Sequence, residues 1–364
     1  MSRSRDNADA VTTVPSGVGR NMVINGAMNV AQRATSVTGV GATAEHYPTL
    51  DRWIIEASTA GRLTMSQTAD GPNGISANCI KLDCTTADTS IAAGEYLLLE
   101  QRLEGQNVQR IGKGVAGAKE VTVSFYVKAN AAFDFALEVL DNTDGRTCSK
   151  LFSTTTDWVR QELTFPADVD DGSSPIADDN ATSIRLFFWL HAGTTYTGGT
   201  LQSGSFANNV NANRAAGIDS FFSSTDNNFF ITGVQMEVGP IATEFEQEDF
   251  GTTLVKCMRY YEKQSADNGQ FIAIGYNEST SNGRGLVPFK VKKRTAPTMS
   301  DSGTHFAALS TGSTGNAADV TFDQPSVDNA RWILTNTNTT LIDGGASLLR
   351  SLADGSFVQA DAEL

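Results

Sequence analysis

The stretch VQMEVGPIATEFEQ, residues 234–247, joins the end of a β-strand to a sharp turn and a return of the chain. Apolar and polar residues alternate from 234 to 239, and this period of two predicts a strand with one face toward a core and the other toward water. Gly239 and Pro240 end the strand, because proline has a fixed φ and no N–H for the sheet. Beyond the turn, the residues expected to contact the core again are Ile241, Ala242 and Phe245.

The composition of the whole chain favours β structure. Of its 364 residues, 40% are apolar and only 19% are charged. The remainder is rich in Thr, Ser, Asn and Gly, which is typical of short strands joined by many turns. A chain of this length exceeds the size at which a single core keeps growing, so two domains are expected.

Charge and hydropathy argue against nucleic-acid and membrane partners. A net charge of −14 would repel phosphate backbones, so nucleic-acid binding is not expected. The basic run KVKKR at 290–294 is interpreted as a strand edge, where lysines discourage unwanted pairing. The first 20 residues lack an apolar run of signal-peptide length, and 18 consecutive apolar residues occur nowhere, so neither export nor membrane insertion is expected.

Cysteine and histidine show no spacing typical of a metal site. There is no CxxC pair, and the histidines at 46, 191 and 305 are too scattered in sequence to indicate zinc. We therefore expect no cofactor. We also predict that the four cysteines are free thiols, mostly buried: Cys79, Cys84, Cys148 and Cys257.

Eight segments within the first 250 residues show the alternation of strands and are separated by clusters of Gly, Asn, Asp and Thr. Eight strands suit a jelly roll or β-sandwich. The predicted strands are RLTMSQ (62–67), CIKLDC (79–84), EYLLLEQRL (95–103), VTVSFYVKA (121–129), FDFALEVLD (133–141), WVRQELTF (158–165), SIRLFFWLHA (183–192) and FFITGVQMEV (229–238).

A long loop and one helix complete the organisation. Residues 193–227 are too many for an ordinary connection and are predicted to form a functional or interface loop. Residues 252–263 predict a helix whose apolar stripe consists of Leu254, Cys257, Met258 and Tyr261. We therefore predict an all-β protein in four parts: a flexible attachment arm at 1–20, a jelly-roll β-sandwich at 21–250, a linker helix at 251–263, and a smaller C-terminal β domain at 264–364.

The strand SIRLFFWLHA is the leading candidate for a binding face. Its alternation directs Ile184, Leu186, Phe188 and Leu190 to the core. The opposite face then carries an arginine, two aromatic residues and a histidine. Aromatic planes beside polar donors are a means of holding sugar rings. The alternative is that these aromatic residues pack under the long loop or against a neighbouring subunit. The glycan-binding candidates are Arg185, Phe187, Trp189 and His191.

The acidic segment ADVDDGSSPIADDN, residues 167–180, is interpreted as a solvated loop. A glycosidase needs two carboxyl groups roughly 5–9.5 Å apart, but no environment that would raise a carboxyl pKa is visible in this loop. The spacing also does not match an EF-hand, so calcium binding is a weaker alternative. Its candidate ligands are Asp168, Asp170 and Asp171. With no nucleophile motif present, we do not expect an enzyme.

Several motifs in fixed order resemble a module of tailed-bacteriophage virion proteins. They are NMVINGAMNVAQRATS (21–36), YPTLDRW (47–53), YLLLEQRLEG (96–105), VTVSFYVKA (121–129), GVQMEVGPIATEFE (233–246) and CMRYYEK (257–263). The resemblance covers roughly residues 21–263. Such modules commonly read Trp-Gln-Arg-Gly where this chain has AQRA at 31–34, so a role for that tryptophan does not transfer.

The resemblance implies a tail fibre or other virion appendage with a carbohydrate-binding-module-like jelly roll. The protein would be made in the host cytoplasm, reside in the virion, contact other virion proteins and adhere to a host surface glycan without covalent chemistry. One alternative is a head-decorating or scaffold-type virion protein that binds only virion proteins, and another is a glycan depolymerase. The resemblance also favours a homotrimer, with assembly-interface candidates Leu254, Met258 and Tyr261.

Overall fold

The structure is a computed structural model that describes residues 19–42, 45–169, 174–303, 305–310, 313–314, 320–335 and 341–364. The chain divides between Thr253 and Leu254 into two compact units, which are described separately below. The predicted arm at 1–20 lies outside the described residues, apart from Gly19 and Arg20.

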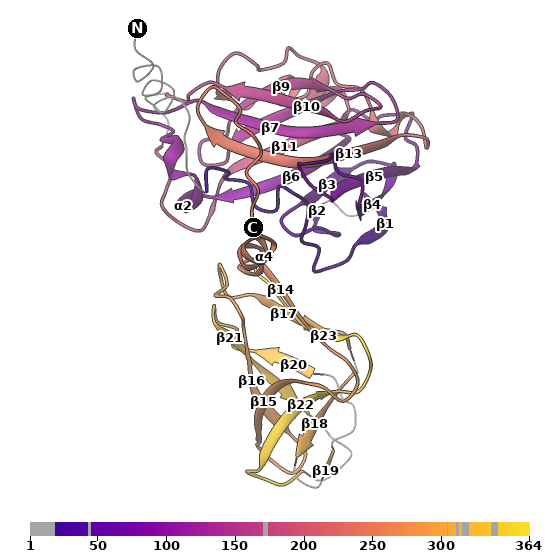
Figure 1. Cartoon of the computed structure of the whole chain (residues 1–364), viewed down its shortest axis with the longest axis vertical. Helices are drawn as coiled ribbons and strands as arrows, with labels where there is room; N and C mark the ends of the chain where they lie inside the picture. Colours follow the sequence, from indigo (N-terminus) through magenta and orange to yellow (C-terminus); the bar gives the residue numbers. More distant parts are fainter. Residues whose placement is uncertain are drawn as a thin grey trace. The chain divides into compact units, whose positions relative to one another are not determined.

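The first unit is built from two antiparallel sheets, whose strands can be followed in Figure 1. The six-stranded sheet has the order β1 (Ser36–Val40), β4 (Arg62–Thr68), β5 (Cys79–Thr86), β13 (Asn228–Val238), β7 (Val121–Ala129) and β10 (Val159–Phe165). The seven-stranded sheet has the order β12 (Ala207–Asn208), β9 (Arg146–Ser153), β8 (Asp134–Asp141), β11 (Thr182–Ala192), β6 (Tyr96–Glu104), β3 (Ile54–Ser58) and β2 (Glu45–His46).

Alternating side chains from both sheets form the main core of this unit. Phe125 of the six-stranded sheet packs edge-to-face on Phe188 of the seven-stranded sheet, with ring centroids 5.1 Å apart, and both rings are fully buried. The whole chain is all-β with a jelly-roll sandwich, a short helix and a smaller C-terminal β domain, which confirms the predicted fold class. All eight predicted strands are present. Five further strands of this unit were not predicted: β1, β2, β3 and β12 have five residues or fewer, and the alternation of β9 is weak.

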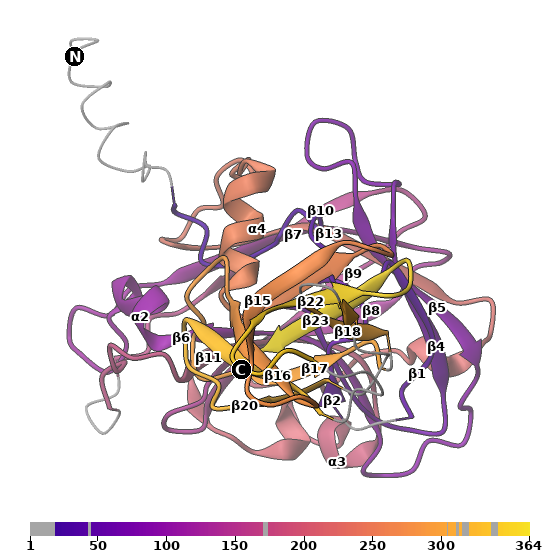
Figure 2. The ribbon, with the colours of Figure 1, turned by 90° about the horizontal axis from the view of Figure 1, so that it is seen from below.

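Short helical turns connect the strands of the sandwich. The first pair, α2 (Gly105–Val108) and η1 (Gln109–Ile111), follows β6 directly. The long loop predicted at 193–227 contains α3 (Thr194–Thr197), the strand β12, and the turns η2 (Asn211–Asn213) and η3 (Phe221–Ser223). Figure 2 shows α3 and, elsewhere on this unit, the neighbouring strands β1, β4 and β5.

The stretch around residue 234 closes the sandwich, but differently from the prediction. Val234 and Met236 enter the core as expected, yet Gln235 and Glu237 are buried too rather than facing water. The returning chain covers them: Glu237 accepts hydrogen bonds from the backbone N–H and the hydroxyl of Thr243, at 2.9 and 2.8 Å. This return leaves Phe245 buried but Ile241 63% exposed, so the expectation that Ile241 contacts the core is wrong.

The Asn-Gly pair of the N-terminal motif fits against the same strand. Asn25 adopts a left-handed φ of 58°, which asparagine tolerates better than most residues. Its side-chain oxygen accepts hydrogen bonds from the backbone of Asn29 and Val30. A Cβ on Gly26 would lie 2.1 Å from the carbonyl oxygen of Val234. Glycine is therefore required at position 26 for the motif to pack on β13.

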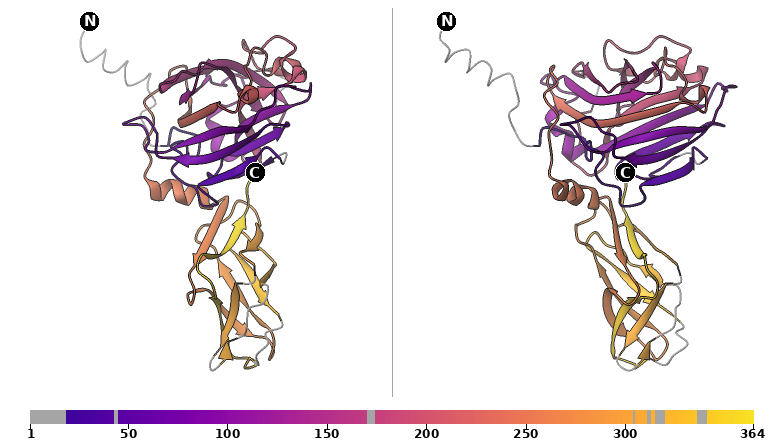
Figure 3. Two further views of the ribbon diagram at one scale, coloured as in Figure 1. Left: turned by 90° about the vertical axis from the view of Figure 1, so that its right-hand side faces the viewer. Right: turned by 45° about the vertical axis from the view of Figure 1, so that its right-hand side comes forward.

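The second unit contains two further antiparallel sheets, coloured orange to yellow in Figure 3. The three-stranded sheet has the order β14 (Tyr261–Ala266), β23 (Ser356–Asp361) and β17 (Thr298–Asp301). The seven-stranded sheet has the order β19 (Ser313–Thr314), β18 (Phe306–Ser310), β22 (Ala346–Ser351), β15 (Phe271–Asn277), β16 (Gly283–Pro288), β21 (Asn329–Leu334) and β20 (Val320–Asp323). Trp332 is fully buried in the core of this unit.

Two sequence interpretations near the unit boundary need correction. The helix α4 spans Phe250–Met258, shorter than the predicted 252–263, because the chain turns into β14 at Tyr261. The run KVKKR at 290–294 is not a strand edge, since β16 ends at Pro288. Lys293 is instead buried and pairs with Glu262, with 2.6 Å between Nζ and Oε2.

Candidate functional site

A pocket of about 270 Å³ opens on the outer face of the seven-stranded sheet of the first unit, opposite the main core. Strands β3, β6, β8 and β11 form its floor, and the segment from 193 to 214 forms part of its wall. The lining residues are Glu56, Tyr96, Leu98, Leu140, Asn142, Gly145, Arg185, Phe187, Trp189, Tyr196, Asn209 and Arg214.

Aromatic rings make up the apolar part of this pocket. Trp189 lies 5.1 Å from Tyr196 and 6.5 Å from Phe187, measured between ring centroids. Tyr96 packs edge-to-face on Tyr196 at 5.6 Å. Trp189 and Phe187 are only 1% and 2% exposed, whereas the two tyrosines are half-buried. The tyrosines therefore offer accessible ring surface, and the other two rings support them from below.

The burial of Trp189 and Phe187 corresponds to packing under the long loop, one of the two alternatives derived from the sequence. Together with Leu98, Ala136, Leu140 and Ala215 they form a small apolar cluster, against which Tyr196 and Ile218 of the loop also pack. An open aromatic face on β11 is therefore not present. The loop leaves a pocket beside these rings instead of covering the sheet completely.

Two arginines line the same pocket and are held by buried carboxylates. Arg185 donates to Glu100 at 2.5 and 2.9 Å and to Glu56 at 3.0 Å. Arg214 donates through Nε to both oxygens of Glu138, each at 3.0 Å. Glu100 and Glu138 are fully buried, so the two guanidinium groups are fixed in place by strong charge-assisted bonds.

The guanidinium groups also enclose the aromatic floor. The Cζ atom of Arg185 lies 4.4 Å from the ring centroid of Phe187, and the Cζ atom of Arg214 lies 5.4 Å from the same centroid. Arg214 is also 4.8 Å from the ring of Trp189, whose indole N–H donates to Glu138 at 2.6 Å. Trp189, Arg214 and Glu138 thus form one buried network in which each group positions the other two.

Burial is the largest influence on the pKa values of the carboxyl groups of Glu56 and Glu138. Burial raises the pKa of Glu56 most, and the neighbouring negative charge of Glu100 raises it further. The positive charge of Arg185 acts to lower it. Burial likewise raises the pKa of Glu138. Burial and then the charge of Glu56 raise the pKa of Tyr96 to about 12, so its phenol stays protonated and able to donate at neutral pH.

Of the four residues predicted on β11, three line the pocket and one does not. Arg185, Phe187 and Trp189 lie on the outer face, as the alternation predicts. His191 is fully buried and outside the pocket lining. A β-bulge after Trp189 explains the difference: Trp189 pairs with Leu98 on the outer face, but His191 pairs with Leu97, which belongs to the main core. The extra residue shifts the alternation by one.

His191 instead joins two carboxylates at the end of β11. His191, Asp88 and Glu95 each offer one metal-ligating atom, and these three atoms lie within 4.8 Å of one another. The sequence interpretation missed this group because the residues are far apart in the chain. It also missed the pocket residues Tyr96, Tyr196 and Arg214, although the loop predicted to carry recognition supplies the last two.

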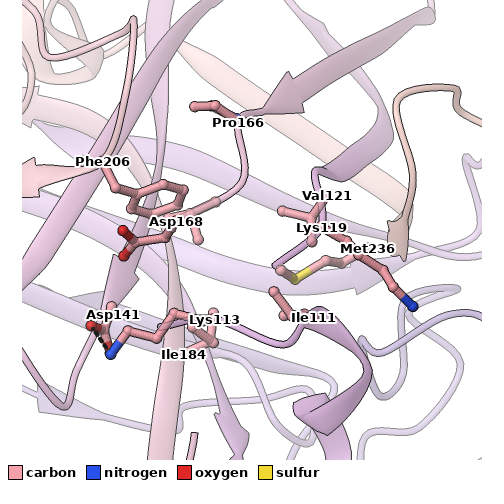
Figure 4. A pocket seen from close by; sticks show the side chains of 11 residues that line it. Ile111, Lys113, Lys119, Val121, Asp141, Pro166, Asp168, Ile184, Phe206 and Met236 are labelled. Atoms are coloured by element: carbon pink, nitrogen blue, oxygen red, sulfur yellow. Dashed lines mark ion pairs between the residues drawn. The ribbon is translucent and has the colours of Figure 1, made fainter. Parts of the chain in front are cut away.

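A second cavity, shown in Figure 4, is much smaller and of a different kind. Its volume of about 20 Å³ has room for about one water molecule. Lys113 and Asp141 form a buried ion pair there at 2.7 Å. Asp168 also lines this cavity, and its carboxylate accepts three hydrogen bonds from Arg146 at 2.9–3.1 Å.

The pairing with Arg146 corrects the weaker calcium assignment at Asp168, because a carboxylate neutralised by arginine is a poor cation ligand. Asp168 is also buried and not part of a solvated loop. The other two calcium candidates, Asp170 and Asp171, lie outside the described residues.

The assembly candidates differ in accessibility. Leu254 and Met258 lie on α4 and are half-buried. Tyr261 belongs to β14 rather than to the helix, is 2% exposed, and donates its hydroxyl to Gln359 at 2.6 Å. A side chain that is 2% exposed contributes little surface to contact with another chain.

All four cysteines are buried and free, as predicted. A search of the described residues for a helix long and apolar enough to cross a membrane finds none.

Comparison with protein-family models and with curated proteins gives no match. Solved structures similar to this chain include several carbohydrate-binding modules and one α-L-arabinofuranosidase, of which 27% is covered. One, described as "CBM4 structure and function", has a TM-score of 0.31 and 13% identity over 59% of this chain and 97% of its own. A family 11 module from Clostridium thermocellum in complex with a β-1,3-1,4-mixed-linked tetrasaccharide has a TM-score of 0.30 and 12% identity, covering 59% of this chain and 99% of its own.

A family 61 module in complex with β-1,4-galactotriose is similar to the same degree, with a TM-score of 0.29 and 13% identity over 60% of this chain and 99% of that one. At such TM-scores these likenesses carry no argument about the ligand or the family of this chain.

Proposed function

We propose that this protein is a non-enzymatic structural component of a tailed-bacteriophage virion, a tail fibre or related appendage, that adheres to a host surface glycan through the outer-face pocket. It would be made in the host cytoplasm and function in the virion. The order of motifs between residues 21 and 263 supports the virion assignment. The pocket supports the glycan assignment.

Several polar groups in the pocket have no hydrogen-bond partner among the described residues, and the glycan proposal is based on them. Within the described residues, the hydroxyl of Tyr196 and the two terminal nitrogens of Arg214 have no hydrogen-bond partner. The side chains of Asn142 and Asn209 are exposed at the rim. These donors and acceptors stand beside half-exposed tyrosine rings, which is the combination that a sugar requires: stacking for its apolar ring face and hydrogen bonds for its hydroxyls.

The size and charge of the pocket restrict the ligand. Its volume of about 270 Å³ is near the lower end of the roughly 300–1,000 Å³ typical of small-molecule sites, which suits a terminal sugar or a short segment rather than a long chain lying in a groove. Each arginine is already paired with a carboxylate, so a large excess of positive charge is absent among the lining residues. Weak binding at one such pocket would be strengthened when several copies act together.

The test is binding of the full-length protein to an array of bacterial surface glycans, followed by titration of any glycan that is retained. We expect Tyr196→Ala to weaken binding about tenfold, a loss of about 1.4 kcal/mol, because it removes both an accessible ring face and a hydroxyl from the pocket. Tyr126→Ala is the matched control, because Tyr126 is also a half-buried tyrosine but lies on β7 of the other sheet.

Three results would count against the proposal. Equal losses in Tyr196→Ala and Tyr126→Ala would place the binding elsewhere. No retained glycan, combined with stable association with purified virion proteins, would favour the head-decorating or scaffold-type alternative. Release of reducing sugar from host polysaccharide would identify a depolymerase.

We further propose that the protein acts as a homotrimer assembled through the second unit. A row of apolar side chains crosses three neighbouring strands on the outer face of its larger sheet. Ile274 on β15 pairs with Leu286 on β16 and with Leu348 on β22. Ile274 and Leu286 are 71% and 52% exposed. Phe271 and Tyr276 extend the row along β15 and are also about half exposed. A contiguous apolar face of this kind supports an interface with other copies or other virion proteins.

A further inference from the structure

The feature that carries a further inference is the group formed by Asp88, Glu95 and His191 in the first unit. Asp88 and Glu95 come from the connection between β5 and β6, and His191 comes from the end of β11. One donor atom of each lies within 4.8 Å of the other two. No sequence motif relates these positions, so the fold alone brings them together.

The histidine is held in a state suited to metal binding. His191 is fully buried, and its Nδ1 lies 2.7 Å from the hydroxyl oxygen of Ser220. Its Nε2 is buried without a hydrogen-bond partner among the described residues. An unpaired buried polar atom is costly. When one ring nitrogen of a histidine binds a metal, the other nitrogen usually hydrogen-bonds to a neighbouring group, as Nδ1 does here with Ser220.

The ring is also held in position by packing. It packs edge-to-face on Phe222, with 5.3 Å between centroids.

Hydrogen bonds position the two carboxylates without using all of their acceptor capacity. Oδ2 of Asp88 accepts from the hydroxyl of Thr59 at 2.7 Å and from the N–H of Ala60 at 3.1 Å. Oε2 of Glu95 accepts from the N–H of Ala92 at 2.7 Å. Asp88 is 5% exposed and Glu95 is half-buried, so the group is enclosed on one side and accessible from the other.

We propose that Asp88, Glu95 and His191 bind one Zn²⁺ ion. One imidazole nitrogen and two carboxylate oxygens are donors that Zn²⁺ accepts in a tetrahedral site, with water as the fourth ligand. Calcium is disfavoured, because it takes six to eight oxygen ligands and this group supplies an imidazole.

The ion would order the chain around the candidate glycan pocket. Glu95 directly precedes Tyr96, which lines that pocket. The carbonyl of Glu95 accepts from the N–H of Gly193 at 2.8 Å, and the carbonyl of Ala93 accepts from the N–H of Thr195 at 2.9 Å. Zinc at Glu95 would thus fix the connection that supports both Tyr96 and the short helix carrying Tyr196. The metal site itself does not depend on the proposed function.

The test uses the full-length chain, treated with EDTA, dialysed, and titrated with Zn²⁺ by calorimetry, with Ca²⁺ in a parallel titration. We expect one Zn²⁺ per chain, an upward shift of the thermal unfolding midpoint on addition of Zn²⁺, and no comparable response to Ca²⁺. Glu95→Gln keeps an oxygen that can accept from Ala92, and His191→Gln is close in size to the native residue. Each should lower the Zn²⁺ affinity at least a hundredfold while leaving the circular dichroism spectrum of the metal-free protein unchanged.

Two further variants separate this site from adventitious binding. Ser220→Ala removes the partner of His191 Nδ1 and should weaken Zn²⁺ binding about 10- to 100-fold. His305→Gln alters an exposed histidine of the second unit and should change nothing. The proposal is overturned if the protein binds no Zn²⁺, if Glu95→Gln and His191→Gln bind it as well as the native chain, or if His305→Gln abolishes the binding.

Discussion

Truncation of Trp189 tests how the outer-face pocket is built. The indole is 1% exposed, donates to Glu138 at 2.6 Å, and packs between Arg214 and Tyr196. If the ring were an open binding surface, Trp189→Ala would affect ligand binding and leave stability almost unchanged. The packing predicts the opposite: a large loss of stability, accompanied by collapse of the pocket floor.

The expected magnitude follows from two losses. Replacing a buried tryptophan by alanine typically costs about 3–5 kcal/mol. The buried carboxylate of Glu138 also loses a donor, and a hydrogen bond to a charged group is worth about 1.5–3 kcal/mol. The two are not additive, because Arg214 remains paired with Glu138. We expect Trp189→Ala to lower the free energy of unfolding by about 4 kcal/mol or more, and Trp189→Phe to cost about half as much.

Urea unfolding followed by circular dichroism gives the change in free energy, and hydrogen exchange of peptides from β8 and β11 assigns it to the first unit. Trp158→Ala is the matched control. Trp158 is half-buried on the other sheet, where it donates to the carbonyl of Asp70 at 3.0 Å, so its truncation should cost less. A loss below about 1 kcal/mol for Trp189→Ala, equal to that of the control, would refute the argument that Trp189 is a packing residue.

Three other predictions concern the rest of the chain. Lys293→Met should lower the free energy of unfolding in urea by about 3–5 kcal/mol, because it leaves the charge of Glu262 buried without a partner. The double variant Lys293→Met with Glu262→Met should recover most of that stability. Equal stabilities of the single and double variants would contradict this. Burial raises the pKa of Cys148 to about 11, so at pH 8 its thiol is protonated, and labelling should be slow in the native protein but should reach four thiols per chain in denaturant without reductant. Light scattering should report about 116 kDa, three times the chain mass of 38.7 kDa, and Ile274→Glu with Leu286→Glu should give the monomer mass; a native monomer would exclude the trimer.

Local alternation was sufficient to predict eight of the sandwich strands. A strand such as β7 repeats every two residues whatever its partners are, and its hydrophobic pattern therefore predicts both the strand and the face that is buried. The same reasoning correctly placed Phe188 in the core and Arg185, Phe187 and Trp189 on the opposite face of β11.

Properties that depend on distant segments could not be predicted in this way. Gln235 and Glu237 are buried because the chain returns over them, and Trp189 is buried because the loop that follows β11, including Tyr196 and Ala215, packs on it. A single bulge moves His191 to the core side of β11 and places it beside Asp88 and Glu95. The sequence by itself determined eight of the sandwich strands and which of their faces are apolar, since those follow from local periodicity. Only the tertiary structure decided what covers the outer face and which polar groups meet, because these depend on contacts between segments that are far apart in the chain.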